Sequence, residues 1–273
     1  MYAATYQSVI DSLRVTAPVT QPVVMVIAAP EPKPDQKPKV TDITANLPNA
    51  NLEMASAQAD GISHVALDSL LQQYVSASGQ VNYKGLKANK EVLDAYCQSL
   101  SYQPVQDSWS REEQMAYWIN TYNAFTLKLI VDNYPTKSIL NFDGGKTWDV
   151  KRIKIGDKKY SLNNIENDIL RPQFKDARIH FAINCAAKSC PPLWNRAYTA
   201  KNLETALDTR AKAFINNSGF NKISAGKASV SKIFDWYGVD FGDLKKFLNR
   251  YAEVQLKGNA AVVFEEYNWD LNE

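Results

Sequence analysis

The chain has 273 residues, of which 45% are hydrophobic, so it can hold one large domain or two small ones with an ample core. Its formal net charge is only +2, and Lys and Arg are interleaved with Asp and Glu throughout. This balance excludes the concentrated basic surface of a nucleic-acid-binding protein. Three cysteines are too few for a disulfide scaffold.

Aromatic residues and prolines divide the chain near residue 60. All six tryptophans and all ten phenylalanines come after residue 100, whereas seven of the twelve prolines lie from Pro18 to Pro48. A segment poor in large apolar side chains cannot bury enough surface to offset the entropy lost on ordering. The sequence therefore predicts a disordered Pro/Ala-rich arm over residues 1–60 and one domain over residues 61–273.

The apolar run VVMVIAA at residues 23–29 is the candidate targeting segment. It is far too short to cross a bilayer. The residues before it lack the basic start of a signal peptide, because Asp11 precedes the first basic residue, Arg14. We therefore expect no transmembrane span and no signal peptide in this arm.

Apolar residues at helical spacing predict helices over residues 64–75 and 90–100, and Cys97 falls on the apolar side of the second. A capping box, Ser110 to Glu113, opens the strongest predicted helix, which runs to about Asn133. Its apolar positions surround most of the axis, which indicates burial on most sides. The side chains expected to face solvent are Gln114, Tyr117, Thr121, Lys128 and Asp132.

Two carboxamides, Asn120 and Asn123, fall among the apolar positions of this helix. A buried carboxamide needs hydrogen-bond partners. Backbone groups of a nearby loop could supply them, or the two side chains could belong to a ligand or catalytic site.

The rest of the chain alternates helices with short strands. Two hairpins are expected, 152–155 with 159–161 and 222–224 with 228–231. The other predicted elements are helices over 162–170, 199–216 and 241–253 and a strand over 261–265. Because this order has no regular βαβ rhythm, it predicts an α+β fold with helices packed around short antiparallel strands and hairpins.

Residues 178–193, RIHFAINCAAKSCPPL, combine one of the two histidines with two of the three cysteines. Ile179, Phe181 and Ile183 alternate with smaller or polar residues, which predicts a strand ending near Cys185. A turn or a short helix should follow, ending at Pro191. This pattern brings an imidazole and thiols to an irregular connection, where active sites are often built.

Three kinds of chemistry fit this stretch. Cys185 could be the nucleophile of a thiol enzyme, supported by His180 or Asn184, although a regular strand would point His180 and Cys185 to opposite faces. Cys185 and Cys190 could instead form a small disulfide or simply be buried. A metal site that includes these side chains is the third, but the spacing matches no common zinc pattern. We predict neither a metal nor a cofactor.

Five blocks carry a family resemblance. They are WINTYNA at 118–124, IENDILR at 165–171, RIHFAINC at 178–185, CPPL at 190–193 and YNWDLN at 267–272. In this order they resemble the domain of unknown function 547 family, in its bacterial form, over residues 67–272. The resemblance implies a family that is often exported or periplasmic and that has no established reaction.

The family pattern is matched residue by residue at Asn120, Asn123, Glu166, Arg171, His180, Cys185 and Cys190. Many relatives have histidine where this chain has Asn167. We predict that Asn120, Asn123, His180 and Cys185 converge in a cleft, with His180 and Cys185 as catalytic candidates. The predicted lining residues are Asn120, Asn123, Glu166, Arg171, Asn184 and Cys190.

Two functions follow as alternatives. The first is a hydrolase or transferase that acts on a small or peptide-like substrate. The second is a non-catalytic binding or scaffold module in which the His/Cys cluster is structural. The expected ligand is accordingly a small molecule or a peptide, and a protein partner fits the second alternative.

Overall fold

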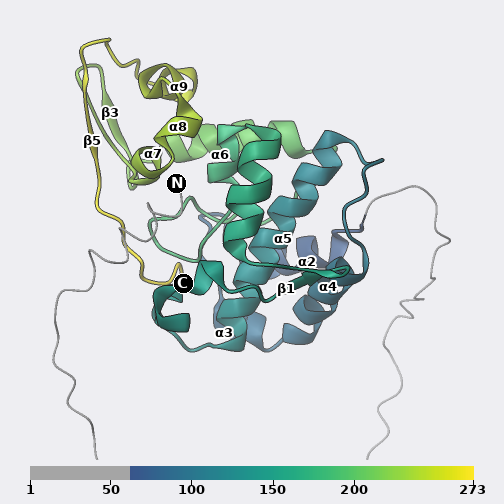
Figure 1. Cartoon of the computed structure of the whole chain (residues 1–273). Helices are drawn as coiled ribbons and strands as arrows, with labels where there is room; N and C mark the ends of the chain where they lie inside the picture. Colours follow the sequence, from purple (N-terminus) through teal and green to yellow (C-terminus); the bar gives the residue numbers. More distant parts are fainter. Residues whose placement is uncertain (1–61) are drawn as a thin grey trace, which may run out of the picture. The chain divides into compact units, whose positions relative to one another are not determined.

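The computed structural model describes residues 62–273, so the predicted arm and its apolar run at residues 23–29 lie outside the described residues. The described part is α+β, as predicted. Its first helices are α2 (Val65–Tyr74), α3 (Tyr83–Lys87), α4 (Lys90–Tyr102) and α5 (Arg111–Asp132). In Figure 1 they lie together with the first hairpin, and the C-terminus of the chain comes close to α3.

Helix α5 is the centre of the core, and α3, α4 and α6 (Leu203–Ile215) pack against it. The predicted capping box is confirmed: Ser110 Oγ accepts from the Glu113 N–H, and the Glu113 carboxylate accepts from the Ser110 N–H. Tyr117 and Thr121 do not face solvent as expected, since both are fully buried. The Tyr117 hydroxyl donates to the Leu100 carbonyl of α4 at 3.1 Å, so α4 covers the face that the sequence assigned to water.

Both predicted hairpins are present. β1 (Ile153–Ile155) pairs antiparallel with β2 (Lys158–Tyr160), and β3 (Lys222–Ser224) pairs antiparallel with β4 (Lys227–Val230). The last strand, β5 (Ala261–Phe264), lies parallel to β4 and completes a three-stranded sheet of order β3-β4-β5. These three strands lie beside α7–α9 at one end of the described part (Figure 1).

Three short helices precede β5: α7 (Ile233–Trp236), α8 (Gly238–Phe241) and α9 (Leu244–Tyr251). The helix expected over residues 241–253 is therefore shorter and starts later. Gly242 has a positive φ of 62°, which ends α8, and Asp243 then accepts from the Lys246 N–H to cap α9. This break places Asp240 at the end of α8, a position that matters for the site.

The prediction of a strand that ends near Cys185 is wrong. Residues Ala177–Phe181 form a 3₁₀ helix, η5, which Asp176 caps by accepting from the Arg178 N–H at 3.0 Å. The alternating pattern misleads because Ile179, His180 and Phe181 are all buried and no face points to solvent. Residues 182–190 then form irregular backbone without the short helix that could have followed.

The helix expected to end before Pro172 is also longer than predicted. Residues Asn164–Phe174 form a π-helix, η4, which contains Pro172 and ends at Lys175 in a left-handed conformation. A π-helix bonds each residue to the one five positions away. Glu166 and Arg171 are five apart, so η4 brings to one side two residues that an α-helix would point apart. Helix η4 packs against α5 and η5.

Candidate functional site

Asn123 of α5 holds the irregular segment that follows η5. Its Nδ2 donates to the Ala182 carbonyl at 2.9 Å, and its Oδ1 accepts from the Asn184 N–H at 2.8 Å. All of these groups are buried. One carboxamide thus satisfies two backbone groups that would otherwise be left without partners in the core.

The Asn184 side chain likewise bonds to backbone groups, here those of the residues that follow it in the segment. Its Nδ2 donates to the Pro191 carbonyl at 2.9 Å, and its Oδ1 accepts from the Ala186 N–H at 2.9 Å and from Asn272 Nδ2 at 3.2 Å. The Tyr83 hydroxyl donates to Asn272 Oδ1 at 2.7 Å. The asparagines therefore join three distant parts of the chain: α5, the segment that carries the cysteines, and the C-terminal residues.

Asn120 anchors a different segment. Its Nδ2 donates to the Tyr198 carbonyl at 2.7 Å, and its Oδ1 accepts from the Tyr198 N–H at 3.0 Å. The loop-backbone interpretation therefore accounts for the hydrogen bonds of both Asn120 and Asn123. Only Asn123 bonds directly to the segment that leads to the cysteines.

His180 pairs with Asp240, a residue that the sequence did not suggest. His180 Nε2 lies 2.8 Å from Asp240 Oδ2, and the Arg171 guanidinium donates to both oxygens of the same carboxylate at 2.6 and 2.9 Å. The Tyr237 ring stacks on the His180 ring at 3.9 Å and lies 5.1 Å from the guanidinium. These contacts fix the imidazole in one orientation.

The electrostatics of this cluster favour the ionised carboxylate. Burial raises the pKa of Asp240, but the hydrogen bonds from His180 and Arg171 outweigh it and hold the pKa well below its ordinary range. Arg171 also donates to Asn167 Oδ1 at 2.7 Å, so the residue that departs from the family pattern positions the guanidinium.

Cys185 and Cys190 lie next to each other as free thiols. The Cys185 N–H donates to Cys190 Sγ at 3.1 Å, and Cys185 Sγ lies 3.2 Å from the Tyr267 hydroxyl. Hydrogen bonding from Cys190 and, more weakly, from Tyr267 lowers the pKa of Cys185 against the opposing effect of burial. Burial raises the pKa of Cys190 well above its ordinary value. The two thiols are thus chemically unequal.

Glu166 of η4 lies within electrostatic range of both clusters. It is only 2% exposed, and its carboxylate opposes ionisation of Cys185 while favouring the charged form of Arg171. The contacts therefore divide the predicted residues into two groups, with Glu166 near both. Asn123, Asn184 and Cys185 form the first, and Arg171 and His180, which Asp240 joins, form the second. The convergence of Asn120, Asn123, His180 and Cys185 in one cleft stays a prediction.

Sequence reasoning missed three residues of these clusters: Tyr237, Asp240 and Tyr267. Asp240 and His180 are sixty positions apart in the chain, and no sequence motif predicts that they pair. Tyr267 does have a signal, because it opens one of the five blocks that carried the family resemblance.

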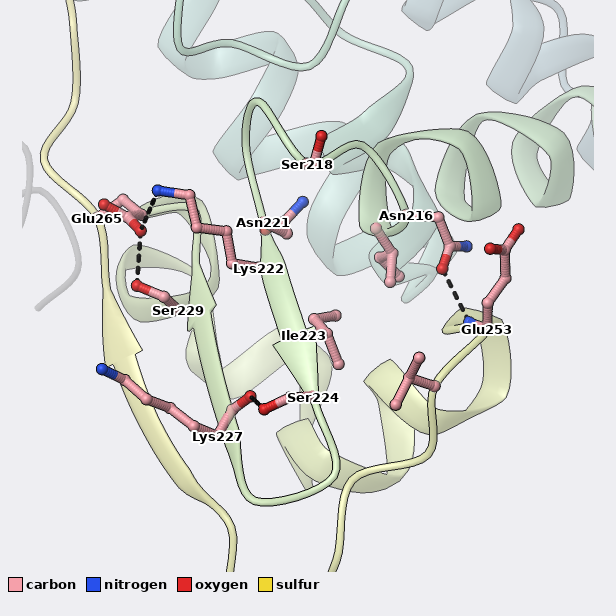
Figure 2. Close-up of a pocket in the computed structure, with 12 residues that line it drawn as sticks. Asn216, Ser218, Asn221, Lys222, Ile223, Ser224, Lys227, Ser229, Glu253 and Glu265 are labelled. Carbon is pink, nitrogen blue, oxygen red and sulfur yellow. Dashed lines mark hydrogen bonds and ion pairs between the residues drawn. The ribbon is translucent and has the colours of Figure 1, made fainter.

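A separate hollow of about 630 Å³ lies between the end of α6, the β3–β4 hairpin and residues 253–254 (Figure 2). Glu265 on its wall accepts from Ser229 Oγ at 2.6 Å and pairs with Lys222 at 3.8 Å. Its lining includes both Lys and Glu, so it offers no single charge to a ligand, and none of the predicted site residues lines it.

Between residues 62 and 273, no three His, Cys, Asp or Glu side chains are grouped as a metal site requires. Over the same range no helix is both long enough and apolar enough to cross a membrane.

The fold and contacts define an α+β domain in which a buried helix holds a thiol-bearing loop through asparagine side chains. The model of a family described as "Protein of unknown function, DUF547" matches residues 106–215, which confirms the resemblance over that range. The matched range includes α5, η4 and both loop cysteines, whereas Asp240 and Tyr267 lie beyond it. Searches of curated proteins and of solved structures gave no match.

Replacing Asn123 with alanine should destabilise the domain, because the Asn184 N–H and the Ala182 carbonyl lose their buried partner. We expect the free energy of unfolding to fall by about 1–3 kcal/mol, as measured by urea denaturation. Asn133→Ala is the matched control, since Asn133 is exposed at the end of the same helix and bonds only locally. Equal losses in the two variants would contradict the anchoring role of Asn123.

The Asp240 cluster should make stability depend on pH. A carboxyl whose pKa is lower in the folded chain stabilises the fold above its unfolded pKa of about 4, and this contribution is lost progressively as the pH falls from that value toward the much lower pKa in the folded chain. Asp240→Asn should therefore lower the free energy of unfolding by about 2 kcal/mol at pH 7, with a smaller difference from the natural chain at pH 3. Asp157→Asn, exposed in the β1–β2 turn, should show no such dependence. A pH-independent effect of Asp240→Asn would count against the ion-pair account.

Proposed function

We propose that the domain is a thiol-dependent hydrolase or transferase acting on a small or peptide-like substrate, with Cys185 as its nucleophile. A thiol attacks as the thiolate, so a nucleophilic cysteine needs a lowered pKa. One observation carries the proposal. Cys185 has two hydrogen-bond partners, Cys190 and Tyr267, and they lower the pKa of its thiol although the residue is buried.

The proposed reaction has two steps. The Cys185 thiolate attacks the carbonyl carbon of the substrate, a C–S bond forms, and the bond from that carbon to the leaving nitrogen or oxygen breaks while the leaving atom takes a proton. Water, or an acceptor amine or alcohol in a transferase, then attacks the thioester and gives up a proton. The C–S bond breaks and the sulfur leaves as the thiolate.

We assign the proton transfers to His180. Asp240 occupies Nε2 of the imidazole, so a proton exchanged with the substrate has to pass through Nδ1. The carboxylate fixes the orientation of the ring, as an orienting acid does beside a catalytic histidine. Arg171 supports this arrangement by holding Asp240 from the other side.

The remaining predicted residues have positioning roles in this proposal. Asn123 and Asn184 hold the loop that presents the thiol. Cys190 Sγ accepts from the Cys185 backbone N–H, and hydrogen bonding from the Cys190 side chain lowers the pKa of Cys185. Glu166 works against ionisation of Cys185 through its nearby carboxylate, the weakest of the effects on the pKa of that thiol. Asn120 acts at a greater remove, by fixing the segment around Tyr198.

The alternative is a non-catalytic binding or scaffold module in which these polar groups only hold the fold. It is favoured by one observation: the carboxamides of Asn123 and Asn184 bond to backbone and to each other's segment rather than toward a space for a ligand. In that case the two neighbouring cysteines serve packing, or become a disulfide in an oxidising compartment.

Limited alkylation separates these functions. Iodoacetamide at pH 7.5 should modify Cys185 of the folded chain first, as read by peptide mass spectrometry. Cys97 is an internal control, because burial raises its pKa to about 12, and Cys185→Ser should remove the fast-reacting site. Modification of Cys185 only after unfolding would rule out the nucleophile.

A count of free thiols tests the disulfide within the alternative function. The structure has three free cysteines, so chain denatured without a reductant should react with three equivalents of a thiol reagent. Only one equivalent would show that Cys185 and Cys190 are bridged, which would contradict the thiol reaction under those conditions.

A further inference from the structure

Three of the six tryptophans lie close together, although they come from three separate parts of the chain. The ring of Trp269 lies 5.7 Å from that of Trp148 and 5.9 Å from that of Trp236. Tyr267 completes the group, with its ring 4.6 Å from Trp269 and 4.8 Å from Trp236. We call Trp236, Tyr267 and Trp269 the aromatic platform.

The aromatic platform differs from the aromatic core of the domain. The core rings of Phe181 and Phe234 are each 1% exposed, whereas all three platform residues are only half-buried. Trp148, whose ring contacts that of Trp269, is itself buried. Half-buried aromatic rings that cluster on a rigid backing are typical of ligand-binding surfaces, because a ring offers a large apolar face at a small entropic cost.

Tyr267 connects the platform directly to the thiol. Its hydroxyl lies 3.2 Å from Cys185 Sγ, while its ring contacts both platform tryptophans. A group that packs on these rings is therefore separated from Cys185 Sγ by no more than the Tyr267 side chain. The segment that carries Tyr267 and Trp269 is itself fixed to the cysteine loop, because the Ser189 N–H donates to the Asn268 carbonyl at 3.2 Å and the Asn268 N–H donates to Ser189 Oγ at 2.8 Å.

We infer that the aromatic platform binds an aromatic or other flat apolar group of the substrate and places the adjoining carbonyl at Cys185. The inference rests on the proposed function and narrows it: the substrate class becomes acyl or peptide-like molecules with such a group next to the bond that is broken. Polar small molecules, which cannot pack on the rings, are poor substrates.

Two thiol probes test this without knowledge of the natural substrate. Chloroacetamide and N-benzyl-2-chloroacetamide carry the same reactive carbon, and only the second carries an aromatic group. The rate of Cys185 modification is measured with each probe and divided by its rate with glutathione. The aromatic probe should be favoured about tenfold in the natural chain, the gain expected from packing one ring against aromatic neighbours.

Variants assign the preference to the platform. Trp269→Ala should reduce the preference to about onefold to threefold, and Trp269→Phe should keep most of it, because a phenyl ring retains an apolar face. Trp194→Ala is the matched control, since Trp194 is also half-buried but packs on Tyr198 outside the platform. The chloroacetamide rate of each variant shows whether Cys185 keeps its natural environment.

The outcomes separate the two proposals. A reactive Cys185 without preference for the aromatic probe, or with an unchanged preference in Trp269→Ala, overturns the inference and leaves the proposed function standing. A Cys185 that reacts with neither probe overturns the proposed function and the inference with it. A preference lost in Trp269→Ala and kept in Trp269→Phe and Trp194→Ala supports both.

Discussion

The two hydrogen bonds of the Asn123 carboxamide are the constraint on which the site depends. Irregular backbone can lie in a protein core only where its polar groups find partners. The backbone N–H and C=O groups of α5 bond within the helix, so they cannot serve as partners for the loop. A side chain of α5 has to supply these hydrogen bonds instead. Asn123 offers one donor and one acceptor to the Ala182 carbonyl and the Asn184 N–H, which permits a loop, instead of a strand or helix, to carry Cys185 through the interior.

Further side-chain hydrogen bonds connect this anchor on α5 to the C-terminal residues. Asn184 transfers the restraint to the Pro191 carbonyl and to Asn272, and Asn272 is held in turn by Tyr83. The last residues therefore cannot leave the core without exposing buried polar groups. Their position brings Tyr267 to the sulfur of Cys185. A thiol that is nearly inaccessible to water thus acquires hydrogen bonds that favour its ionised form, and groups with such shifted pKa values cluster at functional sites.

Much of the fold could be predicted because its signals are local. The capping box at Ser110 and the paired short strand patterns are read from neighbouring residues, and α5 and both hairpins follow from them. The site could be predicted only in part. Asn123 and Asn184 do meet, but His180 bonds to Asp240, because that contact is made by tertiary packing that no local pattern encodes. The sequence predicts a strand where residues 177–181 form a 3₁₀ helix, because alternation does not identify a strand when consecutive residues, Ile179, His180 and Phe181, are all buried.

The rate at which Cys185 is alkylated as a function of pH tests the central claim most directly. Each pH gives a rate from peptide mass spectrometry, and the midpoint of the curve reports the pKa of the thiol in the folded chain. If Asn123, Cys190 and Tyr267 hold this thiol as described, the midpoint lies below the value of about 8.5 for a free cysteine and rises in Tyr267→Phe. A midpoint above 8.5, unchanged in Tyr267→Phe, would contradict the account.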